Sequence, residues 1–99
     1  MPSEFENQQA VNRAAEAKAL LESTLLTESF AKLRRGYIDQ LMNTDATQSA
    51  IRDKYWMAAR VVDVVKDHLV KVVNDGAVAR ADLEKIAREG ERKRRFGVL

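Results

Sequence analysis

Residues 51–73 read IRDKYWMAARVVDVVKDHLVKVV, and this stretch decides the fold. When its residues are placed at 100° intervals, the apolar side chains gather on one stripe, which predicts an amphipathic helix. The paired valines keep the helical period, and the length of the stretch favours a helix over a strand. The stripe consists of Ile51, Tyr55, Ala58, Val62, Val65, Leu69, Val72 and Val73.

A second set of side chains on the same predicted helix extends the apolar surface to one side of this stripe. A chain of 99 residues has few other elements with which to cover it. We therefore expect self-association or docking onto a partner, because small domains have modest stability and large exposed apolar patches mark interaction sites. The side chains of this predicted interface are Met57, Val61, Val64 and His68, joined by Trp56.

Trp56 falls on the polar side of the same predicted helix. Exposed tryptophans are enriched at the energetic centres of protein interfaces. The alternative is that the first or second helix covers Trp56 within the same chain. The sequence leaves both interpretations open.

The composition predicts an all-α fold. The sequence is 45% apolar and 32% charged, with one proline at position 2 and four glycines. Such scarcity of helix breakers favours long helices and short connections. We expect three to four helices around a central helical hairpin, completed by oligomerisation. Residues 1–90 would form a single helical domain, and residues 91–99 a basic C-terminal tail.

Three capping signals predict where helices begin. Ser3 with Glu6 has the spacing of a capping box, in which side chains and backbone N–H groups satisfy each other. Thr27 is the predicted N-cap of a second helix. Asp45 with Gln48 is a second capping-box candidate and predicts the start of the third helix.

Glycines and polar clusters predict where the helices end. Asn43-Thr44-Asp45 is the break before the third helix, and Asp75-Gly76 is the predicted stop after it. A fourth helix would then run from Ala77 to about Gly90. Gly36 lies inside the second helix, where either a close helix crossing or a surface position would account for it.

The residue inventory argues against catalysis and against a cofactor. Cysteine is absent, and His68 is the single histidine, so a zinc site would need carboxylates such as Asp67 and Glu84. We expect a core or interface histidine, no metal and no enzyme activity. Asp63 and Asp67 are spaced like a carboxylate pair, but nearby basic residues favour an ordinary charged face. No apolar run is long enough for a membrane span, and we expect a soluble protein.

The C-terminal end concentrates the positive charge. Residues 88–99 hold five basic and two acidic side chains, so their net charge is +3. The whole chain has a net charge of +2, so the other 87 residues sum to −1. We predict that the tail docks onto protein, because Val98 and Leu99 suit a docking peptide. A solvated terminus and phosphate binding to DNA are the alternatives. The tail residues are Arg92, Lys93, Arg94, Arg95 and Phe96.

The run from Leu20 to Leu83 resembles a group of small helical proteins encoded by tailed bacteriophages and prophages of proteobacteria. The resemblance implies a phage setting, in which small helical oligomers serve DNA packaging, head assembly or the head–tail connection. It assigns no functional residue. The residues that carry it are Leu20-Leu21, Phe30 with Tyr37-Ile38, the Thr44-Asp45 break, Arg52 with Trp56, and Leu69 before Asp75-Gly76.

These observations together predict a non-enzymatic, self-associating phage assembly protein, either a virion component or a DNA-packaging subunit. Its partners would be further copies of itself and other phage structural or packaging proteins, with DNA as an alternative partner of the tail. It would be found in the host cytoplasm during expression, or in the virion. One rival is a small regulator that inhibits a host protein through Trp56. Another is a helical oligomer in which Arg52 and Arg60 line a pocket for a nucleotide-like ligand.

Overall fold

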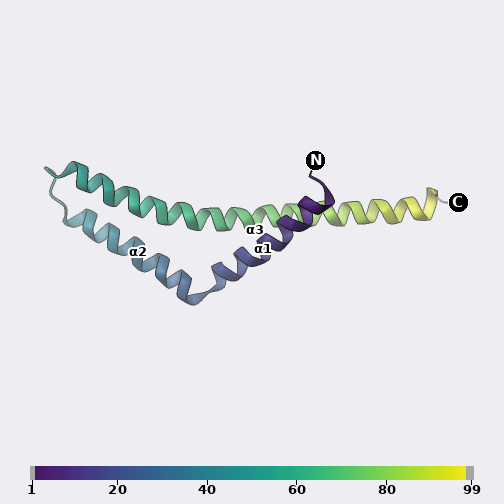
Figure 1. Cartoon of the computed structure of the whole chain (residues 1–99), viewed down its shortest axis with the longest axis horizontal. Helices are drawn as coiled ribbons and strands as arrows, with labels where there is room; N and C mark the ends of the chain where they lie inside the picture. Colours follow the sequence, from purple (N-terminus) through teal and green to yellow (C-terminus); the bar gives the residue numbers. More distant parts are fainter. Residues whose placement is uncertain (1, 98–99) are drawn as a thin grey trace. The chain divides into compact units, whose positions relative to one another are not determined.

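The computed structural model describes the backbone of residues 2–97 and the side chains of residues 2–94. It contains three helices, α1 (Glu4–Glu22), α2 (Thr24–Asn43) and α3 (Ser49–Gly97), and no strand occurs within that range (Figure 1). The predicted all-α fold with a helical hairpin is confirmed. Packing divides the described chain into a hairpin unit, residues 19–70, and a terminal unit, in which residues 2–18 pack with residues 71–97.

The hairpin unit is built on α2 and the beginning of α3. Ser23 has an extended backbone, with φ −68° and ψ 116°, and its hydroxyl accepts a hydrogen bond from the Leu26 N–H at 3.3 Å. Ser23 is therefore the N-cap of α2, and the prediction of Thr27 was wrong. Thr27 lies inside the helix, and its hydroxyl donates to the Leu21 carbonyl at 3.2 Å.

Residues 44–48 join the two helices of the hairpin. The Thr44 N–H closes α2 on the Leu41 carbonyl at 3.2 Å, as the predicted break requires. Gln48 accepts from the Asp45 N–H at 3.3 Å, but Asp45 turns its carboxylate to the Thr47 N–H at 3.4 Å. Asp45 thus forms a local turn, and α3 begins at Ser49, three residues after the Ala46 start that a cap at Asp45 would give.

The third helix does not stop at Asp75-Gly76. It continues to Gly97, so the predicted fourth helix from Ala77 is the second half of α3. A glycine ends a helix when it adopts a positive φ, and none of the described glycines does so. α3 therefore has 49 residues and contributes to both units.

The terminal unit explains the presence of Gly76. A Cβ atom at this position would overlap the Cβ of Ala14 on α1 and would lie 3.1 Å from the Ala10 carbonyl oxygen. Ala17 and Ala79 are also buried. The alanine-rich helix α1 therefore packs closely here, and Gly76 allows its backbone to approach α3. Ser3 caps α1 by accepting from the Glu6 N–H at 3.1 Å, which confirms that capping site.

Candidate interaction surface

One face of α3 in the hairpin unit carries exposed apolar side chains at heptad spacing. Met57, Val61, Val64 and His68 follow one another in steps of four, three and four residues, the pattern of paired helices in coiled coils. Met57 is 60% exposed, Val61 58% and Val64 52%. His68 is exposed as well. We call these four residues the 57–68 stripe.

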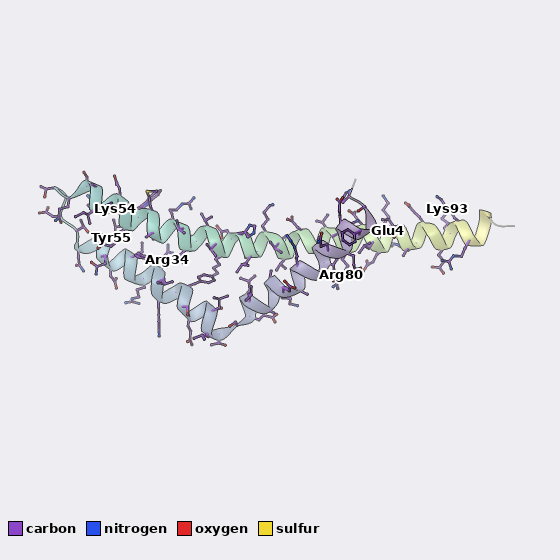
Figure 2. All side chains as sticks on the ribbon, viewed as in Figure 1. Glu4, Arg34, Lys54, Tyr55, Arg80 and Lys93 are labelled. Carbon is purple, nitrogen blue, oxygen red and sulfur yellow. The ribbon has the colours of Figure 1, made fainter. Side chains whose placement is uncertain are left out.

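The opposite face of α3 packs within the hairpin. Ala59 is buried, and Tyr55 and Val62 are half-buried. Tyr55 projects toward α2, whereas the neighbouring Lys54 projects away from it (Figure 2). Since α2 occupies that side, it leaves the 57–68 stripe uncovered.

The two borders of the stripe differ in chemistry. Ala58 and Val65 extend it with apolar surface on one side, and Val65 is 44% exposed. Arg60 and Asp67 lie on the other side, seven residues and therefore about two turns apart. Within residues 2–94, neither of these two charges forms an ion pair. Both are available to an incoming molecule.

Trp56 is 55% exposed, so α2 does not bury it. The intramolecular alternative for this side chain is therefore wrong in the hairpin unit. Trp56 lies about 100° around α3 from Met57, which places it beside the stripe and not in it. A partner covering the stripe would meet Trp56 at its edge.

A salt bridge joins the two helices of the hairpin on a different side. The Arg34 Nε donates to Asp63 Oδ1 at 2.9 Å, and both side chains are partly exposed. Asp63 is thus an ion-pair partner, in line with its prediction as part of a charged face. The pair borders a groove of about 440 Å³ whose other lining residues are Leu20, Leu21, Thr27, Phe30, Ala31, Val62 and Lys66.

A second groove runs between α2 and α3 where Gly36 has no side chain. Apart from the adjoining backbone of α2 itself, no atom lies within 4 Å of a Cβ at Gly36, so the surface interpretation of this glycine is correct. Arg52 and Arg60, the residues considered for a ligand pocket, line neither of these two grooves. The second groove has a volume of about 760 Å³ and is lined by Ser29, Lys32, Leu33, Gly36, Tyr37, Gln40 and Tyr55.

Exposed apolar side chains on α2 were missed by the sequence analysis. Leu25 is 76% exposed and Met42 78%, although both lie in an amphipathic helix. Correct placement of the N-cap at Ser23 would have shown Leu25 to be in the first turn of α2. The unit therefore exposes apolar surface on both of its helices.

The basic segment near the C-terminus is helical. Arg92, Lys93 and Arg94 are exposed on the last turns of α3, where Lys93 is seen in Figure 2. Positive side chains at a helix C-terminus interact favourably with its dipole. The side chains of Arg95 and Phe96, and all of Val98 and Leu99, lie outside the described residues.

Among the residues that the structure describes, no three His, Cys, Asp or Glu side chains come together as a metal site. Within the same part of the chain, no helix is both long enough and apolar enough to cross a membrane.

No protein-family model, curated protein or solved structure matches the chain.

Proposed function

We propose that the chain is a non-enzymatic assembly protein that self-associates through the 57–68 stripe. The observation that carries this proposal is the exposure of Met57, Val61 and Val64, each more than half open to solvent. Their heptad spacing suits a second helix, because side chains at such positions interdigitate with those of a facing helix. Binding of that helix would remove this surface from water.

The small size of the buried side chains supports the same proposal. The buried apolar residues are alanines, namely Ala17, Ala59 and Ala79, and no large side chain within the described residues is fully buried. Burial of apolar area contributes roughly 25 cal/mol per Å², so small side chains provide little stabilisation. A second copy would add the larger side chains of the stripe to the buried surface.

A phage particle is the proposed setting of this assembly. It rests on the resemblance of residues 20–83 to small helical proteins of tailed phages and prophages. The chain would then be a virion component or a DNA-packaging subunit. The tail, with Arg92, Lys93 and Arg94 exposed, would dock onto a larger protein of the particle.

Quantitative mass spectrometry of purified particles from the encoding phage tests this setting. We expect many copies of the chain in each particle, or in particles arrested during DNA packaging. If the chain instead copurifies as one copy with a single host enzyme and is missing from all particle forms, the assembly proposal is wrong.

A small regulator of a host protein is the second candidate, and the exposure of Trp56 favours it. A tryptophan that is 55% exposed offers a large rigid anchor for a foreign pocket. The two candidates respond differently to Trp56→Ala. Loss of a one-to-one complex with a host protein, with self-association unchanged, would favour the regulator.

A further inference from the structure

We infer that the partner of the 57–68 stripe is a second copy of the same stripe in antiparallel orientation. This inference rests on the proposed self-association and specifies its geometry. It is carried by the order of the charges beside the stripe. Arg60 precedes Asp67 on the same border of α3, and within residues 2–94 neither has an ionic partner.

An antiparallel arrangement pairs the four residues of the stripe in complementary layers. The two copies are related by a two-fold axis, so each contact occurs twice. Val61 of one copy packs against Val64 of the other, and Met57 packs against His68. The next heptad position beyond each end of the stripe is a lysine, Lys54 before Met57 and Lys71 after His68, so the apolar stripe ends there.

The same axis brings opposite charges together. Arg60 of one copy lies within about two residues of the axial position of Asp67 of the other, an offset of about 3 Å at roughly 1.5 Å per residue. Long side chains bridge such an offset. On the opposite border, Ala58 approaches Val65 of the second copy, so that the apolar borders also meet.

A parallel arrangement lacks these pairings. It would place Arg60 beside Val65 of the second copy, with no opposite charge across the interface. His68 would also face His68. The charge pattern therefore favours the antiparallel dimer, since complementary charges select orientation and partner more than they add affinity.

Disulfide trapping in the full-length protein tests the orientation. The chain has no cysteine, so introduced thiols are the only ones present. Met57→Cys and His68→Cys chains are mixed under mild oxidation, and products are identified by intact mass. We expect the mixed disulfide, because these positions share a layer. Each variant alone should not crosslink, since like positions lie about 16 Å apart along the axis.

Charge reversal tests the Arg60–Asp67 pairing by sedimentation equilibrium. Arg60→Glu alone and Asp67→Arg alone should each weaken the homodimer by about tenfold, because each creates two like-charge contacts. An equimolar mixture of the two variants should recover an affinity within about threefold of the wild type, since every contact in the mixed dimer is again complementary. Arg52→Glu, on an exposed position away from the stripe, is the matched control and should leave the dissociation constant unchanged.

The outcomes separate this inference from the proposed function. The antiparallel geometry is overturned if the wild-type chain is a dimer but the Met57→Cys variant alone forms a homodisulfide, or if the mixture of variants forms no mixed disulfide. Either result leaves self-association standing. Equal dissociation constants for the charge variants and their mixture overturn the pairing as well. A monomeric wild-type chain would contradict the proposed function itself.

Discussion

Gly76 of α3 lies so close to Ala14 of α1 that a single methyl group at position 76 would occupy the place of the Ala14 Cβ. The Ala10 carbonyl oxygen closes the same space at 3.1 Å. Neither neighbour is the end of a flexible side chain, so the two helices would have to move apart. Gly76 thus sets how closely α1 and α3 approach each other within the terminal unit.

Substitution of Gly76 by alanine should destabilise the protein. Alanine gains about 1 kcal/mol of helix propensity over glycine, but overpacking costs typically 1–3 kcal/mol, and contact with backbone places this site at the upper end. We expect a net loss of roughly 1–2 kcal/mol in the free energy of unfolding, measured by urea denaturation with circular dichroism.

Gly36→Ala is the matched control for that substitution. The space around Gly36 is open, so the same change should stabilise the protein by about 0.5–1 kcal/mol. If both variants are stabilised equally, the close contact between Gly76 and Ala14 is refuted.

Ser23→Ala should cost about 1 kcal/mol of stability, because it removes the side-chain acceptor that caps α2. Thr27→Ala removes an exposed hydroxyl that donates to the Leu21 carbonyl, and it should change stability by less than about 0.5 kcal/mol. Parallel urea titrations compare the two. A larger loss for Thr27→Ala would restore Thr27 as the N-cap.

The Arg34–Asp63 salt bridge should contribute little to stability. Both side chains are more than a third exposed, with fractions of 53% and 36%, and exposed ion pairs are worth about 0.2–1 kcal/mol. A double-mutant cycle with Arg34→Ala and Asp63→Ala should give a coupling energy in that range. The coupling should shrink at high salt, and a value above about 2 kcal/mol would show a structural role that the geometry does not support.

The sequence predicted the helical class, the hairpin and the cap at Ser3 because these depend on local periodicity and capping chemistry. It misplaced the end of the third helix because Asp75-Gly76 has the pattern of a helix stop. The glycine instead serves a contact with α1, which local sequence does not reveal. Exposure of Met57 and Val61 was expected from the excess of apolar surface on one helix. The grooves beside Gly36 and Asp63 were not, since they depend on how α2 packs on α3.

The tail prediction concerns residues 91–99. Their deletion should leave self-association intact, because the 57–68 stripe lies in the hairpin unit, and should lower helical content only by the last turns of α3. We expect the shortened chain to fail to enter phage particles in a complementation assay. If it still enters them and loses DNA binding that weakens steeply between about 50 and 200 mM salt, the tail is a nucleic-acid contact.

Self-association of the full-length chain is the central claim, and light scattering coupled to size-exclusion chromatography tests it most directly. At micromolar to sub-millimolar concentration, with no partner present, we predict a dimer or larger oligomer that dissociates on dilution. Val61→Lys should shift it toward monomer with its helical content unchanged, because the charge would enter the centre of the stripe. A wild-type chain that remains monomeric throughout this range would contradict the claim.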